Sequence, residues 1–130
     1  RAGHILSGAG TVLGILSGLC FMGVVVPADV NMAVHKSFVI WAFRFFPAAV
    51  LCYMVVMLGD KDHPKGYAWE LAAFFVLLVG YMLLLELGPG ITTSAGILIQ
   101  ATGQKVIVYA SIISIMIQAG GARGRNQPAG

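Results

Sequence analysis

The residues best suited to chemistry are four polar side chains within long apolar stretches: Arg44, Glu86, Gln104 and Lys105. A charged side chain at mid-membrane costs on the order of 3 kcal/mol or more unless it is paired or hydrated. We therefore expect Arg44 and Glu86 to form an ion pair. The alternative is that Arg44 reaches outward to lipid headgroups while Glu86 belongs to the membrane interface. Lys105 needs a carboxylate, backbone carbonyls or water.

The histidines and the acidic loop residues form no pattern typical of a reaction centre. His4, His35 and His63 lack the spacings known for metal ligands. Asp60, Asp62 and His63 could hold a cation weakly, but a solvated turn explains the same residues. Motifs that bind phosphates or dinucleotides, or that carry a nucleophilic serine, do not occur. We expect no catalytic residue, no metal and no cofactor, and hence a protein that is not an enzyme.

The composition surrounding these residues is too apolar for an ordinary soluble domain. Of the 130 residues, 58% are hydrophobic and 10% are charged, whereas soluble domains carry about a quarter charged residues. A bilayer core is crossed by roughly 20 apolar residues in a helix, and four windows meet that requirement: 5–26, 38–58, 68–87 and 91–117. The sequence predicts an all-α fold, a polytopic transmembrane helix bundle with four spans. It forms one helical domain over 1–120 and a flexible polar tail over 121–130.

The fourth window is the least regular, because Gln100, Thr102, Gln104 and Lys105 lie near its middle. A continuous helix would bring Lys105 to the centre of the bilayer. A break at Gly103 would instead give a shallow or re-entrant piece followed by a shorter helix from Lys105. We favour the continuous helix, with room for distortion at its centre, and keep the broken helix as the alternative.

Positive charges lie unevenly at the ends of the predicted spans. One side of the membrane receives five of them, and the other receives Lys36 alone; the five are Arg1, Lys61, Lys65, Arg123 and Arg125. Because cytoplasmic loops carry the excess of lysine and arginine, both termini are predicted to be cytoplasmic, with the cell membrane as the expected location. The positive charges that orient the spans in the membrane thus account for the net charge of +3. Without a basic patch, we expect no binding to nucleic acid.

The first predicted span carries Gly10, Gly14 and Gly18 at a spacing of four residues. Glycines at this spacing form a stripe along a helix, where another backbone can approach closely. This stripe predicts a packing seam. Its partner is either a neighbouring helix of the chain or another subunit.

The two cysteines, Cys20 and Cys52, both lie within apolar windows. Their predicted depths differ by about 12 Å by helix rise. Since bridged Cα atoms lie about 6 Å apart, we expect no disulfide between them.

Two stretches of the sequence carry motifs of a known family. A span with glycine and serine runs into a V-P-x-D turn, and a histidine opens the next span; the positions are Gly14, Ser17, Gly18, Gly23, Pro27, Asp29 and His35. Near the C-terminus, a basic residue follows a glutamine at Gln104 and Lys105. These motifs resemble the DRAM-like (damage-regulated autophagy modulator) membrane proteins and their prokaryotic relatives of unknown function. The resemblance implies a six-helix protein of which this chain would hold the last four helices, with Gln104 and Lys105 near a helix start.

The polar residues and the glycine stripe together favour a non-enzymatic structural or accessory subunit with a role in complex assembly. It would act by packing its helices against partner membrane subunits, a second copy of itself or membrane lipids. The alternative is a small oligomeric transporter or channel in which Arg44, Glu86 and Lys105 line a polar path. A membrane enzyme or redox subunit would require a bound cofactor.

Overall fold

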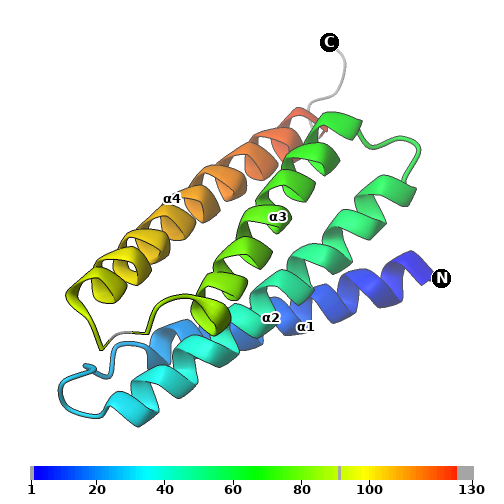
Figure 1. Cartoon of the computed structure of the whole chain (residues 1–130). Coiled ribbons are helices and arrows are strands. Elements are labelled where there is room, and N and C mark those ends of the chain that lie inside the picture. Colours follow the sequence, from blue (N-terminus) through cyan, green and yellow to red (C-terminus); the bar gives the residue numbers. More distant parts are fainter. Residues whose placement is uncertain (1, 91, 126–130) are drawn as a thin grey trace. The chain divides into compact units, whose positions relative to one another are not determined.

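The computed structural model describes residues 2–90 and 92–125, with side chains as far as Gly121. These residues form helices and no strand (Figure 1), which confirms the predicted all-α fold. The helices are α1 (Ala2–Gly23), α2 (Met32–Gly59), α3 (Lys65–Leu87) and α4 (Ser94–Arg125).

Each of these helices is long and apolar enough to cross a membrane, as predicted. The shortest, α1, has 22 residues, or about 33 Å at 1.5 Å per residue. This length exceeds a hydrocarbon core of about 30 Å. Over the residues that the structure describes, the chain is therefore all-helical with four candidate membrane spans.

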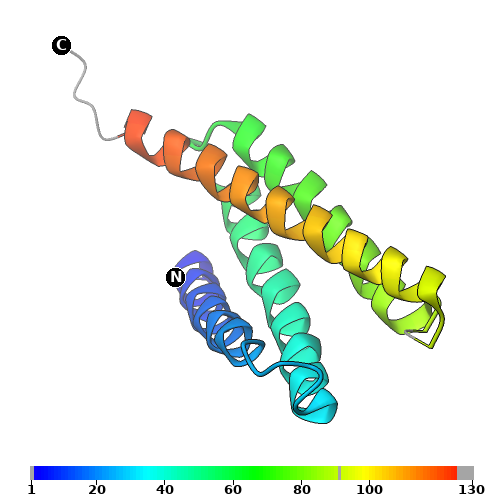
Figure 2. The same cartoon turned by 90° about the vertical axis from the view of Figure 1, so that its left-hand side faces the viewer.

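The helices are arranged as two compact units, Arg1–His63 and Pro64–Gly130. Each unit is a helical hairpin, in which α1 packs along α2 and α3 packs along α4 (Figures 1 and 2). Within each hairpin, the short connection places the two helices side by side and antiparallel. The residues of the domain predicted over 1–120 thus form two hairpins.

The connection between α1 and α2 is built from local hydrogen bonds. After Gly23 the chain leaves the helix, and the N–H of Val26 donates to the Gly23 carbonyl at 3.2 Å. The His35 Nδ1 lies 2.8 Å from the Val26 carbonyl oxygen, which ties the first turn of α2 to the end of this connection. The Asn31 Oδ1 accepts a hydrogen bond from the Val34 N–H at 3.1 Å and caps α2. For this reason α2 begins at Met32 rather than at residue 38, where the apolar window begins.

The last helix, α4, is continuous from Ser94 to Arg125. It begins where the Thr93 hydroxyl accepts a hydrogen bond from the Gly96 N–H at 3.1 Å. The structure confirms the continuous helix and contradicts the alternative of a break at Gly103. It also contradicts the helix start near Gln104 and Lys105 that the family resemblance implied. A glycine inside a helix costs about 1 kcal/mol, whereas each unsatisfied backbone group in hydrocarbon costs several kcal/mol.

The polar tail predicted over 121–130 is wrong in its first part. The helix α4 runs through Arg125, so residues 121–125 continue the helix. Residues 126–130 of that tail lie outside the described residues.

Candidate functional site

The first hairpin is closed by small residues of α1 that face α2. A Cβ atom at Gly10 would lie 3.1 Å from the Cys52 Cβ and 3.2 Å from the Tyr53 ring, so the missing side chain permits this approach. Ser17 is 2% exposed, and its hydroxyl donates to the Ala42 carbonyl at 3.0 Å. Small side chains and interhelical hydrogen bonds are the usual means by which membrane helices associate. The spacing of Gly10 and Ser17, seven residues, is that of a helix seam.

At the other end of α1, aromatic rings replace the small residues. The Phe21 ring packs edge-on against Phe43 and Phe46, with ring centroids 5.2 Å and 6.1 Å apart. Edge-to-face pairs in this range are favourable beyond the area that they bury. Next to them, a Cβ at Gly23 would overlap the Phe38 ring. This glycine therefore lets α2 pass close to the end of α1.

The predicted stripe of Gly10, Gly14 and Gly18 is divided between two sides of α1. Only Gly10 meets α2. Apart from the backbone of α1 itself, no described atom lies within 4 Å of the Cβ position at Gly14 or Gly18. A spacing of four residues turns by about 40° at each step on a helix with 3.6 residues per turn, so Gly18 is rotated by about 80° from Gly10. The stripe consequently leaves the α2 interface after its first glycine.

Arg44 lies on α2, and its side chain is exposed. The guanidinium carbon lies 5.5 Å from the centroid of the Trp41 ring, within the range of a cation–π interaction. Trp41 precedes Arg44 by one helical turn, so the side chain extends toward the beginning of α2. Glu86 is an exposed residue of the last turn of α3. Because Arg44 and Glu86 belong to different hairpins, their predicted pairing stays a prediction.

The second hairpin has a seam of the same kind, which the sequence analysis missed. A Cβ at Gly103 would lie 3.0 Å from both the Tyr81 and the Leu84 side chains. At Gly121 it would overlap the Tyr67 ring at 2.6 Å. The available signal was a spacing of three or four residues along the fourth window, carried mostly by small and polar side chains. The positions on this face of α4 are Gly96, Gln100, Gly103, Ile107, Ser111, Ser114, Gln118 and Gly121.

Two hydrogen bonds from Gln118, which we call the polar clasp, join the end of α4 to the beginning of α3. The Gln118 amide donates to the Glu70 carboxylate at 2.6 Å and to the Tyr67 carbonyl at 3.0 Å. Hydrogen bonds to a charged acceptor are roughly twice as strong as neutral ones. Glu70 and Gln118 were not among the predicted site residues. Their partnership joins residues 48 positions apart, and no local pattern signals it.

The predicted polar residues of α4 lie on different sides of the helix. The Gln100 amide donates to the Pro89 carbonyl at 2.9 Å and thus ties the start of α4 to the preceding connection. Gln104 is half-buried, whereas Lys105 is exposed. Lys105 follows Gly103 by two residues, a turn of about 200°. Since Gly103 faces α3, Lys105 projects from the opposite side of the hairpin.

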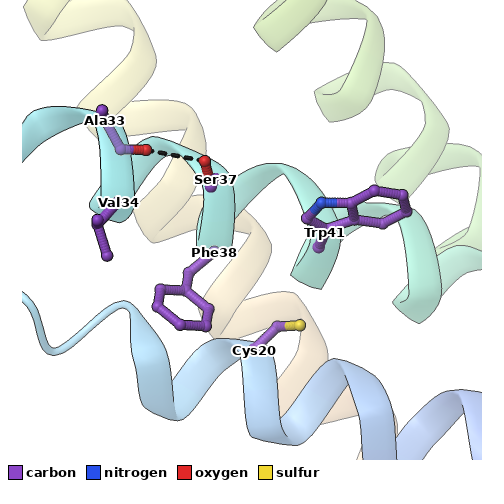
Figure 3. A pocket seen from close by; sticks show the side chains of 6 residues that line it. All are labelled: Cys20, Ala33, Val34, Ser37, Phe38 and Trp41. Carbon is purple, nitrogen blue, oxygen red and sulfur yellow. Dashed lines mark hydrogen bonds between the residues drawn. The ribbon is translucent and has the colours of Figure 1, made fainter.

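An open groove lies between α1 and α2 near their connection. It has a volume of about 380 Å³ and is lined by Cys20, Ala33, Val34, Ser37, Phe38 and Trp41 (Figure 3). The one hydroxyl of this set, on Ser37, donates to the Ala33 carbonyl of its own helix at 2.9 Å. The groove is therefore apolar in character, which suits a hydrocarbon chain better than a polar substrate.

The acidic loop between the hairpins has the geometry of a turn. The Asp60 carboxylate accepts a hydrogen bond from the Asp62 N–H at 3.1 Å, as aspartates in turns commonly do. Among the residues that the structure describes, no three His, Cys, Asp or Glu side chains are grouped so that they could hold a metal ion. Cys20 and Cys52 are both free, which confirms that they are not joined by a disulfide.

No protein-family model, curated protein or solved structure matched the chain. The DRAM-like resemblance therefore stays a prediction.

Proposed function

We propose that this protein is a non-enzymatic accessory subunit of the cell membrane, with both termini in the cytoplasm, and that it acts by packing its helices against partner membrane proteins. The observation that carries this proposal is the split glycine stripe of α1. Gly10 is used within the chain, while no described atom outside the backbone of α1 lies within 4 Å of the Cβ positions of Gly14 and Gly18. A small-residue surface of this kind allows a further membrane helix to approach closely.

The exposure of α1 and α4 supports the same proposal. Only 11% of the most apolar window is buried in α1, and the same share in α4. Lipid can cover such surfaces, but an open glycine pair gives lipid chains little to pack against. A second helix gains more contact there because its backbone approaches the glycines directly.

The orientation follows from charge. Lys61 and Lys65 belong to the connection between α2 and α3, and the positive-inside rule places such a loop in the cytoplasm. With four spans, both ends of the chain then lie on that same side.

The proposal is tested by the size of the complex in native membranes. Nanodiscs formed directly from the expressing membrane with a styrene–maleic acid copolymer keep lipids and partners in place. We expect the full chain to elute as a complex larger than itself, and Gly14→Leu to reduce that size. Since Gly14 has open space around its Cβ position, this change leaves the hairpin folded.

Gly8→Leu is the matched control. It is the same substitution in the same helix, also in open space, but Gly8 lies off the stripe. Gly8→Leu should leave the complex unchanged. An unaltered complex with Gly14→Leu, or a chain that elutes alone without any substitution, would contradict the proposal.

The exposed Lys105 favours a second function, an oligomeric transporter in which Arg44, Glu86 and Lys105 line a polar path. Intramembrane charges often mark such paths. A flux assay in liposomes decides between the two functions. Flux that Lys105→Leu abolishes would support transport, whereas liposomes without flux would refute it.

A further inference from the structure

The outward side of α4 carries a stripe of exposed residues, opposite the face that packs on α3. Successive positions are three or four residues apart, which keeps their side chains on one side of the helix. We call this stripe the outer face of α4; it comprises Leu98, Thr102, Lys105, Tyr109, Ile112 and Met116. Its polar part, Thr102 and Lys105, lies nearer the beginning of the helix, and an apolar surface follows.

The contact between α4 and the preceding connection relates this stripe to the membrane surface. The Gln100 amide donates to the Pro89 carbonyl at 2.9 Å. Pro89 is an exposed residue of the irregular chain between α3 and α4. Irregular backbone that faces lipid does not occur within the hydrocarbon layer. The edge of that layer therefore lies near the level of Gln100.

Lys105 lies five residues beyond Gln100, or about 7.5 Å at a rise of 1.5 Å per residue. Side chains on a helix lean toward its N-terminus, and the N-terminus of α4 lies at the connection. Extended in that direction, the long side chain of Lys105 brings its ammonium to the edge of the hydrocarbon layer. The Cα of Lys105 thus lies within the span, while its charge reaches the level of the lipid headgroups.

The hydroxyl of Thr102 lies on the path of this side chain. Thr102 precedes Lys105 by three residues, so it is the neighbour on the side toward the connection. Within the part of the chain that the structure describes, neither side chain forms a hydrogen bond or an ion pair. An ammonium and a hydroxyl can both donate to the oxygens of a phosphate. The apolar surface below them faces the hydrocarbon chains of the membrane.

Glu86 is the carboxylate of the second hairpin that lies nearest to the level of Lys105, about one helical turn away. The two side chains nevertheless leave the hairpin on different sides. Gly103 of α4 faces Tyr81 of α3, and Glu86 follows Tyr81 by five residues, a turn of about 140°. Lys105 follows Gly103 by two residues, a turn of about 200°. Each side chain therefore points away from the other helix.

A second copy of the chain is a less suitable occupant than lipid. It could offer Glu86 to Lys105 only by placing a different side of its hairpin against the outer face. Such a head-to-tail contact builds rings or filaments rather than a pair. A two-fold pair through the outer faces would oppose Lys105 with Lys105, and like charges repel. Phospholipid surrounds any exposed face of a membrane span and can supply one phosphate to each lysine.

We infer that the outer face of α4 binds an anionic phospholipid. The phosphate accepts hydrogen bonds from Lys105 and Thr102, and the acyl chains lie along Tyr109, Ile112 and Met116. A headgroup with net negative charge is favoured over a zwitterionic one, because basic residues near a membrane surface attract anionic lipids. This inference goes beyond the proposed function, since it concerns lipid at α4 rather than a protein partner at α1.

The test measures which lipid touches the outer face. In the full chain, Trp41→Phe and Trp69→Phe remove both native tryptophans, and Ile112→Trp places one reporter at an exposed position of the stripe. The variant is reconstituted in mixed vesicles of phosphatidylglycerol and phosphatidylcholine. Either one or the other lipid carries brominated acyl chains, which quench tryptophan on contact. We expect phosphatidylglycerol to be enriched at the reporter by about fivefold over its share of the mixture, the effect of one basic residue.

Substitutions at Lys105 identify the group responsible. Lys105→Met should abolish the enrichment, whereas Lys105→Arg, which keeps the charge, should retain it. Lys36→Met is the matched control, because it removes an exposed lysine from α2 of the first hairpin, and it should leave the enrichment intact. Thr102→Val should lower the enrichment without abolishing it.

Three results would overturn the inference. The first is equal quenching by the two brominated lipids, and the second is an enrichment that survives Lys105→Met. The third is a tryptophan at position 112 that neither lipid quenches, since a protein, such as a second copy, would then cover the outer face. These results are separable from those of the proposed function, because a native complex that depends on Gly14 of α1 is measured without reference to α4.

Discussion

The clasp between α3 and α4 allows a quantitative prediction, for which the perturbation is Gln118→Leu. Leucine has nearly the volume of glutamine but cannot donate a hydrogen bond. The substitution removes the bond to the Glu70 carboxylate at 2.6 Å and the bond to the Tyr67 carbonyl at 3.0 Å. It leaves the Glu70 carboxylate, which is half-buried, without this donor.

The expected loss of stability is worked from these two bonds. A hydrogen bond to a charged group contributes about 1.5 to 3 kcal/mol. An interhelical bond between neutral groups in a membrane protein contributes about 0.6 kcal/mol. Because the clasp is only partly buried, solvent screening lowers the first of these contributions. We therefore expect Gln118→Leu to lower the free energy of unfolding by about 2 kcal/mol, roughly a thirtyfold change in the equilibrium constant.

The assay is reversible unfolding of the full chain in mixed micelles with increasing dodecyl sulfate. The chain has two tryptophans, so Trp41→Phe leaves Trp69, beside Glu70, as the reporter of the clasp. Gln104→Leu is the matched control, since it is the same change in the same helix at a half-buried position. If Gln118→Leu costs no more than Gln104→Leu, the clasp does not stabilise the hairpin and the reasoning fails. A double variant that also carries Glu70→Leu should recover part of the loss.

Two further predictions concern packing and topology. Gly10→Leu should destabilise the first hairpin by about 1 to 3 kcal/mol through overpacking, because its Cβ would lie 3.1 Å from the Cys52 Cβ. Unfolding in mixed micelles measures this loss of stability. A loss no larger than that of Gly18→Leu would contradict the prediction. In cells expressing a chain whose own cysteines are replaced by serine, Asp29→Cys should react with an impermeant maleimide from outside, whereas Asp62→Cys should react only after permeabilisation. The reverse pattern would invert the proposed orientation.

The helices of this protein could be located from the sequence because membrane spanning depends on length and apolarity, which are properties of consecutive residues. The windows at 5–26 and 68–87 lie close to α1 and α3 for that reason. Their ends were less predictable. The Asn31 side chain extends α2 backward to Met32, and such capping bonds depend on local geometry that apolarity does not report.

The packing residues could be predicted only in part. The sequence identifies Gly10, Gly14 and Gly18 as small residues in a row, but it does not say which side of α1 faces α2. That rotation is decided by the fit of Gly10, Ser17 and Gly23 against α2. A helix can present only one side to one neighbour, so Gly14 and Gly18 remain open.

For the charged and polar residues, the sequence by itself determined that Lys105 lies within a span, since its position along the chain sets its depth. Only the tertiary structure decided that Lys105 points away from α3 while Gln118 points toward it. Depth follows from the count of residues along a helix, but direction follows from the side that packs, and packing is a contact between distant residues. The pairing of Gln118 with Glu70 required two helices to meet in one register, which no single stretch of sequence contains.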